Sequence, residues 1–255
     1  MITPPDIIRT ENLTVSFDGF RALNRLDFSM EAGELRVVIG PNGAGKTTLL
    51  DAICGKVTPE TGRVLFKGQD LRGLREHEIV HLGIGRKFQT PSVYRNHSVF
   101  ENLELSYKCG KGVFATLAAR RSAHQQEQIE RIAELVGLTH RIGDRAGALS
   151  HGEKQWLEIG MVIVQDPDLL LIDEPVAGMT DEESAKTAEL LISIATDQAI
   201  LVIEHDMTFV RQIARRVTVL HEGAVLCEGS VEQVQNDPRV IEIYLGRERR
   251  SDASH

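Results

Sequence analysis

The first part of the chain alternates short apolar runs with turn signals. Residues 7–40, IIRTENLTVSFDGFRALNRLDFSMEAGELRVVIG, place β-branched and aromatic residues around Asp18-Gly19 and Ala32-Gly33, a pattern typical of strands joined by tight turns. The run 35–39 is a continuous apolar strand, and KTTLLDAICG reads as a helix that ends at Gly55. The segment VTPETGRVLFKGQDL predicts a further hairpin.

The middle of the chain changes to a helical pattern. Between about residues 91 and 160 the strand-like runs give way to segments such as HQQEQIERIAELVGL, where Ile129, Ile132 and Val136 share one helical face. Apolar strands (DLLLID, AILVIEH, RVTVLHEG) then alternate with helical segments, which predicts an α/β fold with a mainly parallel sheet. We expect one domain over 7–246, with a helical insertion at about 91–160 and a frayed tail over 247–255.

Composition narrows the classes of protein to consider. The chain has 255 residues, 42% of them hydrophobic, and a net charge of −8 from 37 acidic and 29 basic residues. This balance argues against nucleic-acid binding, which needs Lys and Arg to neutralise phosphates. Three dispersed cysteines (Cys54, Cys109, Cys227) indicate free thiols in a reducing cytosol. No signal peptide and no apolar run of roughly 20 residues is present, so we expect a soluble chain that can still dock on a membrane protein.

The most specific motif is GPNGAGKTT. It fits the pattern G-x-x-x-x-G-K-[ST] and stands between a predicted strand and a predicted helix. Glycines let successive backbone amides face an anion at a helix N-terminus, Lys46 is expected to reach the β- and γ-phosphates, and the Thr47 hydroxyl is a candidate Mg²⁺ ligand. The candidate phosphate-binding residues are Gly40, Pro41, Asn42, Gly43, Ala44, Gly45, Lys46, Thr47 and Thr48.

Carboxylates end a later strand. In DLLLIDEP, Asp173 and Glu174 follow a buried apolar run, and consecutive residues at a strand end point in different directions. One carboxylate can therefore hold a metal while the other polarises a water as general base. The alternative is a solvated strand end, which the phosphate loop disfavours.

Other candidates are ambiguous from the residues alone. His205, just past the strand AILVIEH, could contact a γ-phosphate or be structural, and Gln89 could touch Mg²⁺ or the attacking water or lie in a surface loop. Phe17 could stack on an adenine ring or belong to the core. The turn LSHGE (Ser150, His151, Gly152, Glu153) could be an ordinary helix start with a serine N-cap or half of a site completed elsewhere.

Taken in order, five motifs resemble the nucleotide-binding subunit of ATP-binding-cassette (ABC) transporters: GPNGAGKTT, the glutamine Gln89, LSHGE, LLLIDEP and VIEHD. The resemblance covers roughly residues 7–245. It implies a RecA-like P-loop NTPase core with an N-terminal antiparallel β subdomain and an inserted helical subdomain. It also implies ATP and Mg²⁺ as cofactors, and an ATPase dimer in which the LSHGE signature of one subunit meets the ATP held by another.

The resemblance gives each candidate a role. Ser150, His151, Gly152 and Glu153 would meet ATP in trans. The groups implied at the subunit's own nucleotide are the Mg²⁺ ligands Thr47, Gln89 and Asp173, the base Glu174, the γ-phosphate sensor His205 and the adenine-stacking Phe17.

Departures from the family pattern affect the signature region. Glu153 stands where Gln is usual and is expected to point away from ATP and to support the helix N-terminus. Thr180 stands where Asp or Asn is common, and Trp156 and Met161 replace common arginines. His151 either adds a donor toward phosphate or marks a lineage, and we favour the second.

A narrower resemblance concerns the substrate. GIGRKFQTP, VFENLELS and DEPVAGMTDEE are similar to the branched-chain amino acid and amide branch of importers, while LSHGEKQWLEIGM, IEHDM and DPRVIEIYLGR are most similar to the ATPase subunit of urea importers. We therefore expect urea as the substrate, with branched-chain amino acids or short amides as the alternative. The expected partners are a second ATPase subunit, identical or different, two permease subunits and, indirectly, an external binding protein.

The resemblance also places the chain on the cytoplasmic face of the bacterial inner membrane as a peripheral subunit.

Two other classes of protein share parts of this sequence pattern. An ABC-type ATPase of DNA repair or chromosome organisation would need long coiled-coil or zinc insertions, and a paired-cassette translation factor would need two cassettes. The sequence has only about a hundred residues between phosphate loop and signature, and one cassette.

Overall fold

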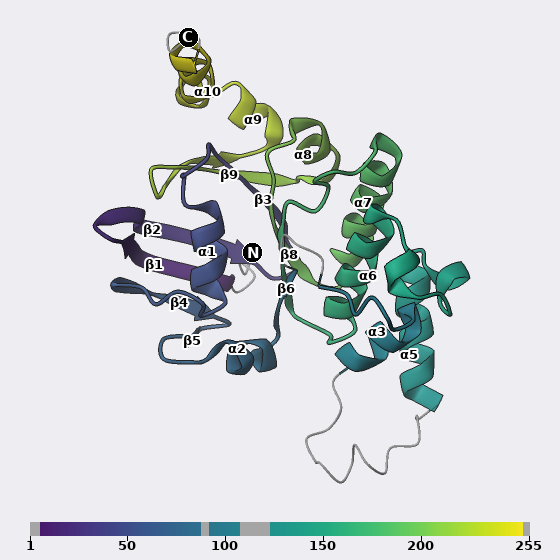
Figure 1. Cartoon of the computed structure of the whole chain (residues 1–255). Helices are drawn as coiled ribbons and strands as arrows, with labels where there is room; N and C mark the ends of the chain where they lie inside the picture. The colour runs from purple at the N-terminus through teal and green to yellow at the C-terminus, as the bar shows by residue number, and fades with distance from the viewer. Residues whose placement is uncertain (1–5, 88–91, 108–122, 252–255) are drawn as a thin grey trace, which may run out of the picture.

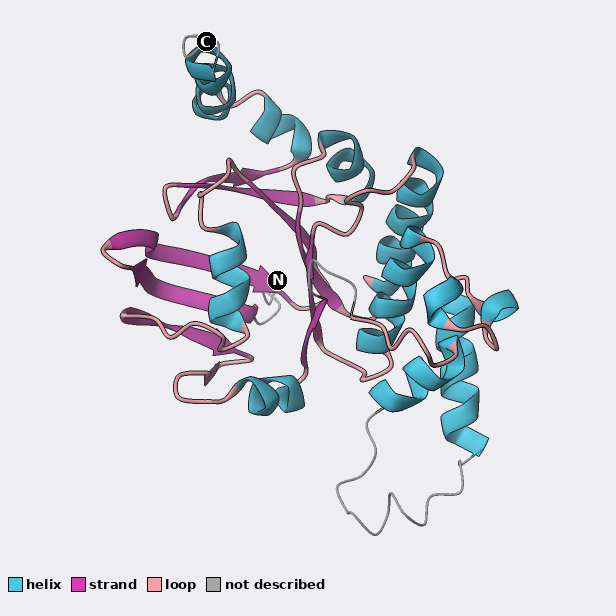
Figure 2. Ribbon diagram, in the orientation of Figure 1, coloured by secondary structure: helices cyan, strands magenta, loops and turns pink. Residues whose placement is uncertain are grey.

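The computed structural model describes residues 6–87, 92–107 and 123–251, and Gln89 lies outside this part of the chain. Two sheets and a group of helices make up the described fold (Figures 1 and 2). The mixed α/β architecture with a β region and a helical region confirms the fold class predicted from the sequence.

The smaller sheet is antiparallel and has the strand order β2-β1-β4-β5. The loop of its first hairpin is Asp18-Gly19, and both residues have positive φ (49° and 86°), as a tight hairpin turn of two residues requires. This turn sets Phe17 opposite Phe20 in the register. The four strands are β1 (Asp6–Phe17), β2 (Phe20–Glu31), β4 (Thr61–Phe66) and β5 (Gln69–Asp70); the last two form the predicted second hairpin.

The central sheet has the order β10-β9-β3-β8-β7-β6. Its strands run parallel except for β10, which pairs antiparallel with β9 at one edge. Every residue of β3, β7 and β8 is buried, because a parallel sheet is covered on both faces. The strands are β3 (Leu35–Ile39), β6 (Ile84–Lys87), β7 (Leu169–Asp173), β8 (Ala199–Ile203), β9 (Arg216–His221) and β10 (Ala224–Gly229).

Helices cover the two faces of the central sheet differently. Helix α1 and the smaller sheet pack on one face, whereas α6, α7 and α8 pack on the other (Figure 1). The helices are α1 (Lys46–Ile53), α2 (Glu76–Leu82), α3 (Val99–Ser106), α5 (Ala123–Leu135), α6 (His151–Ile163), α7 (Asp181–Ile194), α8 (Met207–Ile213), α9 (Val231–Gln235) and α10 (Pro238–Ser251), with short 3-10 turns at Thr139–Arg141 and Ala146–Ala148.

Two helix ends carry sequence signals that the structure explains. Gly55 follows the end of α1 with a φ of 75°, as expected of a glycine that terminates a helix. Helix α10 begins at Pro238, a position that suits a proline in a first turn, and continues to Ser251. The tail predicted over 247–255 stays a prediction. The domain limits 7–246 stay a prediction.

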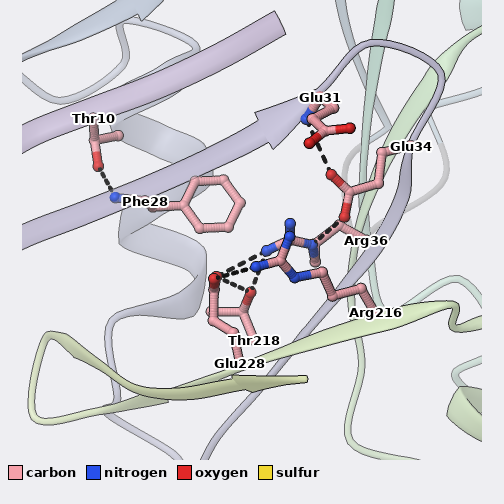
Figure 3. Close-up of polar contacts among 8 residues, drawn as sticks. All are labelled: Thr10, Phe28, Glu31, Glu34, Arg36, Arg216, Thr218 and Glu228. Carbon is pink, nitrogen blue, oxygen red and sulfur yellow. Dashed lines mark hydrogen bonds and ion pairs between the residues drawn. The ribbon is translucent and has the colours of Figure 1, made fainter. Parts of the chain in front are cut away.

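A buried charged network joins the two sheets near the amino end of β3 (Figure 3). The side chain of Arg36 is 1% exposed and its guanidinium lies over the ring of Phe28 of β2, 5.6 Å from the centroid. It donates to Glu34, to Thr218 Oγ1 (2.9 Å) and to Glu228 Oε1 (2.8 Å). We call this network the Arg36 cluster. It comprises Phe28 (β2), Glu34 (the turn between β2 and β3), Arg36 (β3), Thr218 (β9) and Glu228 (β10).

Candidate functional site

The phosphate loop (residues 40–48) joins the carboxyl end of β3 to α1. Two of its glycines are required by close backbone approach: a Cβ at Gly40 would lie 2.3 Å from the Leu220 carbonyl oxygen, and one at Gly45 would lie 2.4 Å from that of Ala22. Helix α1 starts directly after Gly45 with no side-chain cap and no acidic residue in its first turn. Its first amides are therefore available to an anion.

Lys46 already contacts oxygens of this loop. Its Nζ donates to the carbonyl oxygens of Gly40 (2.6 Å) and Pro41 (3.1 Å). The ammonium is thus held over the loop, where phosphate oxygens offer the same kind of acceptor. Asn42, Gly43 and Thr47 are exposed, and the other residues of the predicted cradle, Pro41, Ala44 and Thr48, are buried or half-buried beneath them.

Thr47 and Asp173 come together from α1 and the end of β7. Asp173 is 4% exposed; burial raises the pKa of its carboxyl, while the positive charge of Arg86 and a hydrogen bond from Thr47 act in the opposite direction. A hydroxyl and a carboxylate side by side provide the oxygen ligands that Mg²⁺ prefers. In the described residues no group of three or more His, Cys, Asp or Glu side chains is placed to hold a metal, so an ion here would also need water or phosphate ligands.

Glu174 leaves the strand in an unusual backbone conformation. Its φ is 46°, which costs energy in a residue other than glycine, and its amide donates to the Ile203 carbonyl at 3.0 Å. The side chain is 26% exposed and its Oε1 lies 3.4 Å from Nδ1 of His205. The two adjacent carboxylates thus have different surroundings, with Asp173 buried and Glu174 facing the histidine.

A third carboxylate, which the sequence did not single out, supports His205 from below. Glu204 is 1% exposed and accepts hydrogen bonds from the backbone amides of His205 (2.8 Å) and Asp206 (3.1 Å). Burial raises the pKa of the Glu204 carboxyl, and these amide bonds lower it. The only sequence signal for this role is an acidic residue at the end of a fully apolar strand.

The signature turn (residues 150–153) lies on the opposite side of the central sheet from the phosphate loop, at the start of α6 (Figure 1). Ser150 is the N-cap: its Oγ accepts from the Glu153 amide, and the Glu153 carboxylate accepts from the Ser150 amide at 2.7 Å. Glu153 therefore supports the helix start, as expected from the sequence. His151 Nε2 lies 3.1 Å from the carbonyl oxygen of Ala177 in the loop after β7.

Thr180 has a local role as well. Its hydroxyl caps α7 by accepting from the Glu183 amide at 3.2 Å, and the Glu183 carboxylate accepts from the Thr180 amide at 3.0 Å. A threonine can fill this cap position in place of the Asp or Asn common in the family, because each offers a side-chain oxygen.

Phe17 lies at the tip of the first hairpin and is 47% exposed, so it is not a core residue. Its strand neighbour on the same face, Val15, is buried in the cluster that also contains Leu49 and Leu50 of α1. The ring is therefore on the side of the smaller sheet that faces α1. That position is compatible with the stacking role that the family resemblance implies.

The chain resembles known proteins along most of its length. A family model described as "ABC transporter" matches residues 23–177, and one described as "Branched-chain amino acid ATP-binding cassette transporter" matches residues 224–250. A probable branched-chain amino acid transport ATP-binding protein, LivG of Archaeoglobus fulgidus, is 35% identical over 94% of this chain and 95% of its own. The chain belongs to the ABC transporter family.

Further relatives refine that placement. The high-affinity branched-chain amino acid transport ATP-binding protein LivG of Escherichia coli K12 is 34% identical over 94% of this chain and 98% of its own. A crystal structure of the ADP conformation of an ABC-transporter cassette superposes with a TM-score of 0.83 at 31% identity, covering 94% of this chain and 99% of that one. This ABC protein is the ATP-binding, ATP-hydrolysing subunit of an importer of the LivG-like branch.

The described part of this ABC subunit contains no membrane-crossing candidate, since none of its helices combines the necessary length and apolar character. It does contain a buried ion pair that the sequence did not indicate. Lys87, at the end of β6, lies 3.6 Å from Glu158 of α6, and Glu158 also accepts from the amide of Ser92 at 3.2 Å. Gln89 lies between Lys87 and Ser92 in the sequence, and its role as a Mg²⁺ ligand stays a prediction.

Proposed function

We propose that Glu174 is the general base of ATP hydrolysis in this subunit and that branched-chain amino acids are the substrate of the importer it drives. The catalytic proposal rests on two residue pairs that lie at the carboxyl edge of the central sheet. Thr47 with Asp173 forms one pair, Glu174 with His205 the other, and both adjoin the phosphate loop.

In the proposed mechanism the loop amides and Lys46 hold the β- and γ-phosphates, and Phe17 stacks on the adenine. Thr47 and Asp173 would hold Mg²⁺, which would supply charge that neutralises the phosphates, and Gln89 stays a predicted further ligand. The Glu174 carboxylate accepts a proton from a water molecule, and that water's oxygen attacks the γ-phosphorus, so that ADP leaves and phosphate forms. His205 orients Glu174 and donates toward the γ-phosphate.

The proposed assembly uses two ATPase subunits. Helices α1 and α6 pack on opposite faces of the sheet, which supports a role for the signature turn at a partner's nucleotide rather than its own. Ser150, Gly152 and neighbouring amides would grip that ATP in trans. Closure of the pair drives two permease subunits on the cytoplasmic side of the membrane, and hydrolysis resets them; an external binding protein delivers the substrate.

The substrate assignment follows the relatives. The cassettes from Archaeoglobus fulgidus and Escherichia coli are named for branched-chain amino acid transport, and the family model over residues 224–250 carries the same name. The resemblance of LSHGEKQWLEIGM to urea importers receives no support from these proteins. We therefore place branched-chain amino acids first and urea second.

Replacing Glu174 tests the catalytic proposal. We expect Glu174→Gln to retain ATP binding, to lower kcat by about 10²- to 10⁴-fold, as the loss of a positioned base does, and to accumulate a closed dimer in size-exclusion chromatography with Mg-ATP. Glu182→Gln, on the exposed side of α7, is the matched control and should hydrolyse ATP normally. Turnover near that of the wild type in Glu174→Gln would remove Glu174 as the base.

A transport assay tests the substrate. The subunit is reconstituted in liposomes with its permeases and binding protein, and uptake of labelled leucine is compared with uptake of labelled urea. ATP-dependent leucine uptake is the expected result. Urea uptake without leucine uptake would overturn the substrate proposal and leave the ATPase mechanism intact.

A further inference from the structure

His151 contacts the loop that carries the proposed base. Its Nε2 lies 3.1 Å from the Ala177 carbonyl oxygen, and the amide of Ala177 donates to the carbonyl oxygen of Glu174 at 3.4 Å. Ala177 therefore contacts the signature turn through its carbonyl and the backbone of Glu174 through its amide. Gly178 lies under the imidazole, since a Cβ there would be 3.5 Å from Nε2.

The chemistry of this contact fixes the direction of its hydrogen bond. A carbonyl oxygen only accepts, so Nε2 of His151 must carry the proton. Gln155, one turn along α6, is 1% exposed, and its Nε2 lies 3.5 Å from that same nitrogen while its buried Oε1 has no partner. The buried amide of Gln155 therefore lies against the imidazole and limits its movement.

A second contact joins the same two segments. The carboxylate of Glu183, in the first turn of α7, lies 3.4 Å from Ser150 Oγ and so close to Gly152 that a Cβ there would be 2.4 Å from it. A larger residue at this position would push the Glu183 side chain away from the signature turn. Farther along the same two helices, Trp156 of α6 donates from Nε1 to Thr187 Oγ1 of α7 at 2.9 Å.

We propose that His151 is a positioning residue that couples the signature turn to the conformation of Glu174 within one chain. The inference rests on the proposed role of Glu174 as base. The hydrogen bond to Ala177 holds the loop of residues 174–180 against α6, so the signature turn and the base move as one unit. Closure of the signature on a partner's ATP then orients Glu174 at the chain's own ATP, which links the two sites of a dimer.

Steady-state hydrolysis by three variants of the purified chain tests this coupling. His151→Leu keeps the size of the side chain and removes the donor; we expect kcat to fall about three- to tenfold, the effect of losing one hydrogen bond, with KM for ATP unchanged. His151→Gln, whose amide reaches a similar position, should recover most of the rate. His140→Leu, an exposed histidine of the same helical region, is the control and should behave as wild type.

Hydrogen–deuterium exchange supplies the second readout. Peptides covering residues 174–180 should exchange faster in His151→Leu than in wild type, and His151→Gln should restore protection. A His151→Leu variant with wild-type kcat and wild-type exchange overturns the coupling, and so does a change in KM alone. Because Glu174→Gln is assayed in parallel, normal turnover in that variant identifies failure of the base assignment instead.

Discussion

Charged side chains at the two ends of strand β3 have opposite surroundings. At the amino end, Arg36 is buried with a hydrogen-bond partner in three directions and an aromatic ring beneath it. At the carboxyl edge of the same sheet, burial raises the pKa of the carboxyls of Asp173 and Glu204, and Glu174 has a positive φ.

This difference in surroundings distinguishes charged groups that stabilise the fold from charged groups available for binding and catalysis. A buried charge with a complete set of partners holds two sheets in one arrangement, whereas the opposite edge keeps carboxylates in an environment that disfavours their charge and a backbone that costs energy. A metal cation or a proton donor such as water is the natural partner for such carboxylates. One end of the sheet stabilises the fold and the other retains groups that bind and react.

The largest expected effect is the loss of the Arg36 cluster. Arg36→Met leaves Glu34 and Glu228 without their main cation, and breaking a buried pair from one side costs about 3–5 kcal/mol. Urea unfolding should show this loss, while the Kd for ATP of the folded fraction stays unchanged. Arg9→Met, at an exposed pair, should cost less than about 1 kcal/mol. Equal losses for both variants would contradict the comparison.

The second prediction concerns the other end of β3. Lys46→Ala removes a cation expected at the phosphates, and a hydrogen bond to a charged group contributes about 1.5–3 kcal/mol, so the Kd for ATP should rise about 10- to 100-fold. Isothermal calorimetry measures the binding. The free energy of unfolding should change less than in Arg36→Met, because Lys46 is half-buried and its Nζ bonds two carbonyl oxygens of the phosphate loop. Unaltered ATP affinity would remove Lys46 from the phosphate site.

The smallest expected effect concerns the stability lost by burying the Asp173 carboxylate. Because burial raises the pKa of Asp173 in the folded chain, the penalty is absent below the ordinary value near 3.8, grows as pH rises from there to the folded pKa, and is complete above it. Asp173→Asn should therefore raise the melting temperature without nucleotide, by a few degrees at most since about 1 kcal/mol corresponds to roughly 2–4 °C here. The gain should be larger at pH 8 than at pH 5, and the exposed Asp197→Asn should show neither effect.

Sequence patterns predicted the local elements well and the long-range contacts poorly. The strand–loop–helix around Lys46, the hairpin at Asp18-Gly19 and the alternating strands and helices follow from periodicity and turn chemistry, which act over a few neighbouring residues. Arg36 gave no comparable signal, because its partners Thr218 and Glu228 are more than 180 residues away. Glu204 was hidden for a related reason: its function depends on how the strand end bends after β8.

The signature region shows the same division. A serine followed three residues later by a glutamate predicted a capped helix start, and the capping box at Ser150 and Glu153 agrees with it. The contact of His151 with Ala177 depends on packing between α6 and the loop after β7, which no local pattern encodes. Sequence alone left His151 as a lineage mark; its partner gives it a physical role.

The turn at Gly223 has a practical consequence for protein engineering. Its amide donates to the carbonyl oxygen of Ala44 and its carbonyl accepts from the amide of Asn24, so this single residue connects the phosphate loop to the first hairpin. A fluorophore-binding tag inserted there would displace both. The turn at Gly68, where an added side chain would meet open space, is the better place to attach a reporter that leaves nucleotide binding intact.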